Sequence, residues 1–454
     1  MRRLYLFILT CLAAGVALGG EQPVEFRLDN GMKLIVKPDH RSPIVVSQVW
    51  YKVGASYEPD GVTGVSHVLE HMMFKGTDKY GPNEFSRIIA ANGGEENAFT
   101  GDDYTAYFQT LSSDRLEVAF ELEADRMRNL TLAAEEFAKE VEVVKEERRL
   151  RTEDKPTSLT YEQFQAVAYR SLPYGRPIIG WMNDLENMKV DDLKRWYRLW
   201  YSPNNATLVV AGDVDAAQVL ELARRYFGSL EPESIPPLKP LREPSHHGTA
   251  RLVVRAPAKQ PYLIMGYRAP VVSTAVEPWE PYALEMLAAV LDGGDSARFS
   301  RKLLRGSEIA VSAGADYSAF SRLPGLFELD GIPSKGHSVD DLERAFVAEV
   351  EALKSQLVDE EELERIRAQV VAERIFEQDS LFYQAMQIGA LETQGYDWRL
   401  LDQYVENMRR VTAEQIREVA RKYLVEDQLT VARLDPQPID SGEGDQSTGG
   451  LSDG

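Results

Sequence analysis

The sequence predicts an α+β protein made of two homologous layered domains, each a mostly antiparallel sheet packed on helices. Three observations support this fold class. Strand-like and helix-like segments alternate along 454 residues, a length beyond one ordinary core. A proline-rich stretch at residues 228–250 divides the chain near its middle. Segments before that stretch are similar, in preserved order, to segments after it.

The first half opens with a predicted hairpin, because Asp29-Asn30-Gly31 separates two short apolar runs. Gly212-Asp213 marks the turn after another apolar run. The predicted strands are 24–28, 32–36, 44–53, 97–111 and 206–214, and the predicted helices are 62–75, 83–92, 113–129 and 134–151.

The similarity between the halves is clearest in two acidic segments. Residues 135–149 align with residues 361–375, and at the same offset Glu147 falls on Glu373. His246 and His247 lie in the proline-rich stretch, where a solvated loop is expected rather than a metal site. The predicted organisation is a signal peptide at 1–20, a zinc-binding catalytic domain at 21–232, a linker at 233–250, a homologous domain without the zinc motif at 251–437 and a disordered tail at 438–454.

The N-terminus predicts export. Arg2 and Arg3 precede an apolar run from residue 4 to 17, too short for a membrane span, and small residues place cleavage near residues 19–20. An uncleaved anchor is the alternative. Cys11 is the only cysteine, so the mature chain would have no disulfide, and a periplasmic location is expected. No later segment is apolar enough to span a bilayer, and the net charge of −21 argues against nucleic acid or anionic membrane as partner.

The stretch "VSHVLEHMM" at residues 65–73 carries the chemistry. On a helix, His67 and His71 lie on one face with Glu70 beside them. Two imidazoles so placed can bind one Zn²⁺ while the carboxylate reaches a water bound to it. This is the H-x-x-E-H order. Taken alone, the pattern also fits an ordinary helix whose histidines are hydrogen-bonded in the core.

A longer stretch, "GVSHVLEHMMFKGT", resembles the zinc helix of the M16 metallopeptidases, the inverzincin family of pitrilysin, insulin-degrading enzyme and the mitochondrial processing peptidase. The resemblance implies the LuxS/MPP-like metallohydrolase fold and a third zinc ligand about 76 residues beyond the second histidine. Glu147 stands at that distance, and Glu140 is the nearby acidic residue that helps to set the charge of the site. Glu146 is a neighbouring alternative on another face, and a solvated acidic helix is the plainer reading of the run.

The resemblance also implies how substrate binds. Asn97, Ala98 and Phe99 match an edge strand that holds extended substrate by backbone pairing. Arg305 matches a substrate-contacting arginine, but Ser312 or Val311 stands where the family has a tyrosine. That tyrosine would help to stabilise the oxyanion. Three interpretations stay open: a weakened peptidase, another donor such as Tyr317, or a homologous partner that supplies the arginine–tyrosine pair.

The function expected from these features is a zinc endopeptidase that cleaves peptides or unfolded polypeptides in an exported compartment. Glu70 would activate the zinc water, and the chain would be the zinc-bearing subunit of a heterodimer with a homologous subunit, or of a homodimer. A non-catalytic scaffold or assembly subunit of the same family is the alternative. Hydrolysis of a non-peptide bond is a third, which the sequence alone leaves open.

Overall fold

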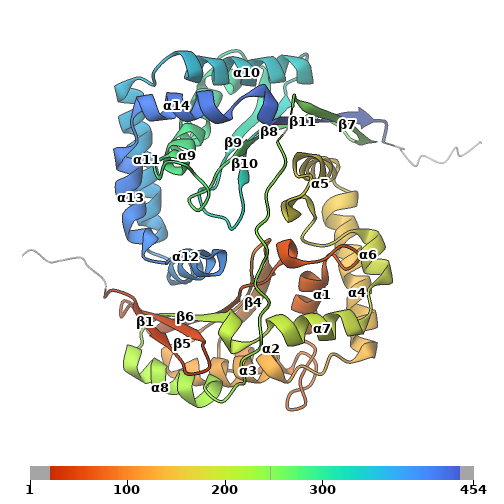
Figure 1. Ribbon diagram of the computed structural model, residues 1–454, viewed down its shortest axis with the longest axis vertical. Helices are drawn as coiled ribbons and strands as arrows, with labels where there is room; N and C mark the ends of the chain where they lie inside the picture. The colour runs from red at the N-terminus through yellow and green to blue at the C-terminus, as the bar shows by residue number, and fades with distance from the viewer. Residues whose placement is uncertain (1–20, 246, 440–454) are drawn as a thin grey trace, which may run out of the picture.

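Two mixed sheets with helices around them make up the molecule in a computed structural model that describes residues 21–245 and 247–439 (Figure 1). The first half comprises β1 (Val24–Arg27), β2 (Lys33–Pro38), β3 (Ile44–Tyr51), α1 (Val65–Met72), α2 (Glu84–Ala91), β4 (Glu95–Thr100), β5 (Thr105–Ser112), α3 (Leu116–Arg128), α4 (Ala134–Arg148), α5 (Pro156–Ala168), α6 (Met182–Asn187), α7 (Val190–Trp200), β6 (Ala206–Gly212) and α8 (Ala216–Phe227). The second half comprises β7 (Ala250–Pro257), β8 (Tyr262–Ala269), α9 (Glu280–Asp292), β9 (Ala310–Asp316), β10 (Gly325–Pro333), α10 (Val339–Ser355), α11 (Glu360–Glu377), α12 (Leu381–Gln394), α13 (Leu400–Arg410), α14 (Ala413–Tyr423) and β11 (Leu429–Gln437).

The two sheets share one strand order, which confirms the predicted pair of homologous layered halves. The first runs β1-β2-β6-β3-β5-β4 and the second runs β7-β11-β8-β10-β9. Apart from the additional β1, each strand of one sheet has its counterpart in the other. The parallel pair β2/β6 corresponds to β7/β11, and the other pairs are antiparallel. Helices α4 and α11, which contain the two similar acidic segments, begin 226 residues apart, at Ala134 and Glu360.

The prediction of one strand at residues 97–111 is wrong. The chain instead forms β4 and β5, joined by a tight turn in which the Gly101 amide donates to the Tyr104 carbonyl at 2.8 Å. Asp102 and Asp103 occupy the turn, so the alternating pattern continued on both sides of a hairpin and concealed it. The predicted signal peptide, His246 and nearly all of the predicted tail lie outside the described residues.

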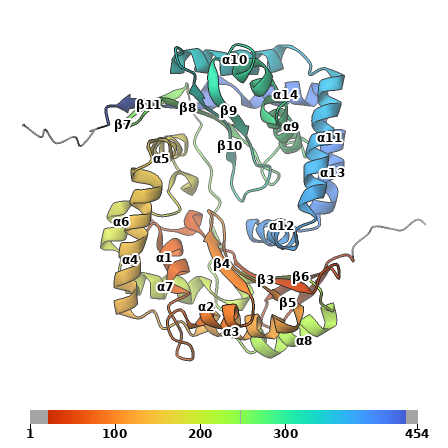
Figure 2. The same ribbon diagram turned by 180° about the vertical axis from the view of Figure 1, so that it is seen from behind.

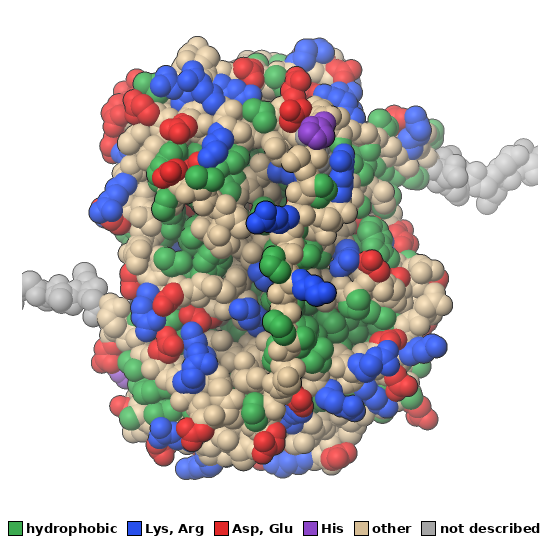
Figure 3. All heavy atoms as spheres, viewed as in Figure 1, with side chains coloured by type: hydrophobic (Ala, Val, Ile, Leu, Met, Phe, Trp, Pro, Cys, Tyr) green, Lys and Arg blue, Asp and Glu red, His purple; other side chains and the backbone are tan. Residues whose placement is uncertain are grey.

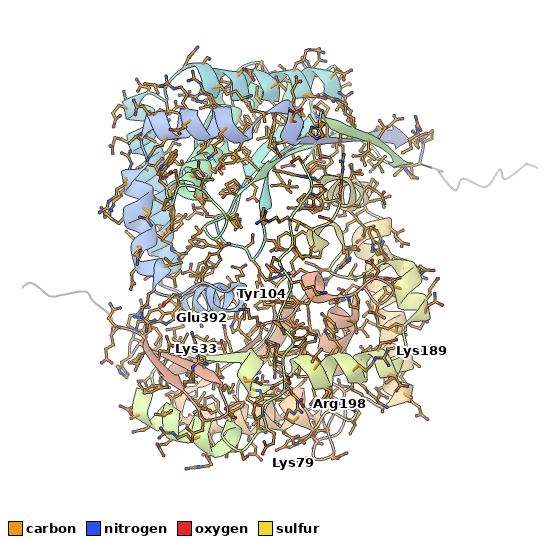
Figure 4. The ribbon with its side chains drawn as sticks, viewed as in Figure 1. Lys33, Lys79, Tyr104, Lys189, Arg198 and Glu392 are labelled. Atoms are coloured by element: carbon orange, nitrogen blue, oxygen red, sulfur yellow. The ribbon has the colours of Figure 1, made fainter. Side chains whose placement is uncertain are left out.

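One helix from each half packs on the sheet of the other half (Figure 2). Helix α12 packs on β3 and β6, while α5 packs on β11, β7 and β8. Trp50, Val209 and Ile388 belong to the apolar cluster under α12, and Phe164, Ile264 and Ala432 belong to the cluster under α5. Figure 4 shows Lys33 of β2 beside Glu392 of α12, and the two form an ion pair at 2.6 Å. The packing of these two helices therefore joins the halves on either side of the space between their sheets.

A polar contact joins the halves closer to that space. Arg322, from the loop between β9 and β10, donates from Nε to Asp103 at 2.9 Å and from Nη2 to the Ser56 hydroxyl at 2.6 Å. Tyr174 also donates to Asp103, on its other carboxylate oxygen. Because Asp103 is buried, this network holds the β4–β5 turn against the second half.

The surface carries charges of both signs. Figure 3 shows acidic and basic side chains side by side over one face of the molecule. Among the described residues no helix is both long enough and apolar enough to cross a membrane.

The α12 contact yields a first test. Gly389 of α12 is buried against Trp50, and a Cβ there would lie 2.2 Å from the indole. We expect Gly389→Ala to lower the free energy of unfolding by about 1–3 kcal/mol despite its better helix propensity, because the overpacked indole is fixed by its hydrogen bond to Gln48. Denaturant unfolding measures this loss. Gly325→Ala, where a Cβ meets nothing within 4 Å, is the matched control, and equal stability of both variants would contradict the packing described.

Candidate metal centre

The start of α1 is held by a buried carboxylate. Glu58 accepts hydrogen bonds from the backbone amides of Gly64 and Ser66, at 2.6 and 2.8 Å, which are free donors at a helix N-terminus. Gly64 has φ +86°, and a Cβ there would lie 2.6 Å from the Ile179 carbonyl. The helix can therefore begin here only with glycine, which lets it pack closely against the segment at 173–180.

His67, His71 and Glu147 converge on one point between α1 and α4. One ligand atom from each side chain lies within 4.8 Å of the others. His67 Nε2 is 3.8 Å from Glu147 Oε1, and His71 Nε2 is 3.4 Å from Glu147 Oε2. Two ligands each bound about 2.0–2.1 Å from a tetrahedral zinc are roughly 3.3 Å apart, so the group fits that ion. No second group of this kind is found among the described residues.

The charge state of His67 suits a metal ligand. Burial, followed by the proximity of His71 and Arg151, lowers its pKa to about 3. The imidazole is thus neutral at physiological pH, which is the form that coordinates metals. A satisfied core histidine would show hydrogen bonds, whereas the buried His67 Nδ1 has no partner among the described residues.

Glu140 supports His71 from behind. Its Oε2 lies 3.3 Å from His71 Nδ1, and its Oε1 accepts from Lys75 at 2.8 Å. A carboxylate on the outer nitrogen of a ligating histidine orients the ring and selects the tautomer. Glu140 and Glu147 share one face of α4, whereas Glu146 is exposed and pairs with Arg149 at 3.0 Å.

Glu70 faces the same cavity as the ligand group. Its Oε2 accepts a hydrogen bond from the Thr100 hydroxyl at the end of β4. Burial raises the pKa of the Glu70 carboxyl, with the Thr100 hydrogen bond acting in the opposite direction. A general base works best when its pKa lies near the operating pH, and the raised pKa brings the Glu70 carboxylate closer to that range.

Two residues at this centre were missed in the sequence. Thr100 directly follows the matched Asn97-Ala98-Phe99 segment, but nothing in the pattern distinguishes it. Arg151 lies four residues after Glu147, in a π-helical turn at Arg149–Glu153, and its Nη1 is 2.6 Å from Glu147 Oε1. The i, i+4 spacing was the available signal for this second contact.

A cavity of about 930 Å³ opens beside the ligand group. His67, Glu70, His71 and Glu147 line it, and so do Asn97, Ala98, Phe99 and Thr100. Strand β4 is the outermost strand of its sheet and pairs on one side only, with β5. Its free edge can therefore accept an extended peptide by backbone pairing.

Arg305 does not line this cavity. It is exposed, and its guanidinium donates to the carbonyls of Ser300 and Asp295 in its own loop. Tyr317 donates its hydroxyl to the Pro270 carbonyl and packs in the core of the second half. Arg305 is therefore the one predicted site residue that lies apart. The other eight lie together: His67, Glu70, His71, Asn97, Ala98, Phe99, Glu140 and Glu147. Substrate contact by Arg305 stays a prediction.

A zinc ion held by His67, His71 and Glu147 would lower the pKa of a bound water and polarise a carbonyl. The remaining parts come from the chain itself. Glu70 can move a proton within the cavity, and the β4 edge can align an extended chain. Fold and site together contain the parts that a metal-dependent peptidase needs.

Comparison with known proteins agrees with this class. Residues 33–181 match the family model "Insulinase (Peptidase family M16)", and residues 187–370 match "Peptidase M16 inactive domain". The chain belongs to the M16 peptidase family. It is 31% identical over 419 residues to "Zinc protease PqqE" of Helicobacter pylori, covering 90% of this chain and 92% of that relative. It is 25% identical over 402 residues to "Uncharacterized zinc protease YmxG" of Bacillus subtilis, covering 88% and 96%.

Solved structures show the same fold. The crystal structure of a protease from Helicobacter pylori has a TM-score of 0.87 and 29% identity, and covers 91% of this chain and all of that chain. The periplasmic protease PqqL from Escherichia coli has a TM-score of 0.77 at 18% identity, and the match covers 92% of this chain and 48% of that one. The predicted family and fold class are confirmed.

Proposed function

We propose that this chain is a zinc-dependent endopeptidase that hydrolyses peptides or unfolded polypeptide segments. The observation that carries the proposal is the convergence of His67, His71 and Glu147 within 4.8 Å, in a cavity that also contains Glu70 and the free edge of β4. The names of the relatives, zinc proteases, support the same activity and the same metal.

The residues of the chain have separate tasks in this proposal. The scissile peptide lies along β4, with Asn97, Ala98 and Phe99 beside it. Glu70, oriented by Thr100, takes a proton from the attacking water and passes it to the leaving amine. Glu140 keeps His71 in the tautomer that presents Nε2 to the metal.

The cellular setting is part of the proposal. Export to a periplasm is supported by the N-terminal charged and apolar run, and the Escherichia coli neighbour is described as periplasmic. Two observations support a homologous subunit that supplies an arginine–tyrosine pair. Arg305 does not line the cavity, and the Tyr317 hydroxyl is hydrogen-bonded to the Pro270 carbonyl. Arg305 could meet substrate only in another arrangement of its loop.

Zinc content and hydrolysis of a quenched fluorescent peptide test the proposal. We expect about one zinc per chain and hydrolysis that a chelator abolishes and zinc restores. Glu147→Gln should weaken zinc binding by more than the roughly 10–100-fold that loss of an outer-shell partner costs. Glu146→Gln is the matched control, because Glu146 is exposed and pairs only with Arg149.

The outcomes separate the alternatives. Unchanged zinc affinity in Glu147→Gln would contradict the ligand assignment. Bound zinc without hydrolysis by the chain alone, followed by hydrolysis with a homologous partner, would place the arginine–tyrosine pair in that partner. Bound zinc without hydrolysis under both conditions would favour the non-catalytic subunit.

A further inference from the structure

The wall of the cavity that belongs to the second half is acidic. Glu328 of β10 lines the cavity, and in the antiparallel register it stands directly opposite Asp316 of β9. Asp330, two residues further along β10, faces the same side. The alternate residues Phe327 and Leu329 point into the core of the second half. Like charges placed directly opposite each other destabilise a sheet, so this arrangement needs a reason.

Among the ion pairs of the described residues, none involves Asp316, Glu328 or Asp330. Glu162, which also lines the cavity, pairs with Arg148 at 2.8 Å. Burial, followed by Asp316, raises the pKa of Glu328 to about 8. A carboxyl that resists ionisation for this reason gains most from a cation placed beside it.

A further carboxylate comes from the first half. Asp102 lines the same cavity, its carboxylate has no hydrogen-bond partner among the described residues, and burial raises its pKa to about 7. The nearest cation, Arg322, is bonded to Asp103 instead. Asp102 and Glu328 both line the cavity with Tyr161 and Tyr169, and the two carboxylates each raise the pKa of both phenols.

The same part of the cavity contains an acceptor without a donor. Gln165 donates from Nε2 to the Tyr161 hydroxyl at 2.6 Å and to Glu328 Oε1 at 3.0 Å. Its Oε1 is buried and has no partner among the described residues. The Gln165 amide oxygen therefore lacks a donor in this part of the cavity, and an N–H group of a bound substrate would supply one. The rings of Tyr161, Tyr169 and Tyr174 add flat surfaces that suit an aliphatic stem ending in a cation.

We infer that Asp102, Gln165 and Glu328 form a subsite for a positively charged group of the peptide, a lysine or arginine side chain or an N-terminal ammonium. The inference rests on the proposed peptidase function and names the substrate class that it selects. Asp102 lies two residues beyond Thr100, which bonds Glu70, so the charged group binds close to the scissile bond.

Binding measured without turnover tests the subsite. The zinc-loaded Glu70→Gln variant of the full chain is titrated with an N-acetylated, C-amidated peptide that contains one lysine, and with the same peptide containing norleucine instead. We expect the lysine peptide to bind about 10- to 100-fold more tightly. A third peptide with norleucine and a free N-terminus distinguishes the two sources of charge, because tight binding of this peptide alone would assign the subsite to the ammonium.

Charge variants then locate the effect. Asp102→Asn and Glu328→Gln, each placed in the Glu70→Gln chain, should lower the ratio of lysine to norleucine affinity to near one. Glu328→Lys should favour a glutamate-containing peptide. Glu418→Gln, an exposed carboxylate on α14 of the second half, should leave the ratio unchanged. Measurable norleucine binding shows that each variant is folded.

Two results are decisive in different ways. Equal affinity for all the peptides, or an unchanged ratio in both charge variants, would overturn the inference even if the wild-type chain hydrolyses peptides. Absence of hydrolysis by the zinc-loaded wild type, both alone and with a homologous partner, would overturn the proposed function, while the binding ratio still decides whether the subsite exists.

Discussion

Glu70→Gln should reduce peptide hydrolysis by about 10²- to 10⁴-fold while zinc remains bound, because a positioned general base contributes that much to rate. Glu70 is not one of the three converging ligand residues, and its carboxylate is held by Thr100 rather than by His67 or His71. Glutamine retains the size and the hydrogen bond from Thr100 but cannot accept the proton. The loss is therefore expected in kcat, with little change in KM or in zinc content.

The matched comparison is His71→Asn, which removes a ligand rather than the base. We expect that variant to lose zinc and activity together, whereas Glu70→Gln loses activity alone. Metal analysis beside single-turnover hydrolysis separates the two cases. Full activity of Glu70→Gln with zinc bound would show that another group moves the proton, and the assignment of Glu70 would be wrong.

The geometry of the metal centre could be predicted from the sequence because its parts are local. His67, Glu70 and His71 occupy two turns of one helix, and Glu140 and Glu147 occupy two turns of another. Helical periodicity alone places each set on one face. Which two helices meet is a tertiary question, and there the family resemblance supplied what periodicity could not. The similarity between the halves likewise predicted that the second half repeats the layered fold of the first.

Other residues were missed because only long-range packing brings them together. Glu328 and Gln165 are 163 positions apart, and they meet only because α5 packs on the sheet of the second half. The β4–β5 hairpin was read as one strand because alternation is the same on both sides of its turn. The position of Arg305, turned back onto its own loop, depends on backbone carbonyls at Asp295 and Ser300 that no motif encodes.

A wholly buried ion pair of α3 packs against β5, the strand that pairs with β4. Arg126 and Glu123 of α3 are 1% and 0% exposed, and Arg126 Nε donates to Glu123 at 2.9 Å. The guanidinium lies over the rings of Phe85 and Tyr107, at 4.1 and 4.5 Å from their centres. Its charge also lowers the pKa of Glu96 on β4, against the upward effect of burial. The pair therefore packs against β5, whose Gln109 also donates to Glu123, and β5 in turn pairs with the strand that is proposed to hold substrate.

Arg126→Met should lower the free energy of unfolding by about 3–5 kcal/mol, because the change leaves the Glu123 carboxylate buried without a counter-charge. Denaturant unfolding measures the loss, and Arg41→Met is the control: Arg41 is exposed and pairs with Asp39, so about 0–1 kcal/mol is expected there. The double variant Arg126→Met/Glu123→Leu should recover most of the stability, since it removes both charges. If the double variant is no more stable than Arg126→Met, lost packing around the guanidinium rather than the uncompensated charge is the cause. In that case α3 is held against β5 by the shape of Arg126 and not by its ion pair.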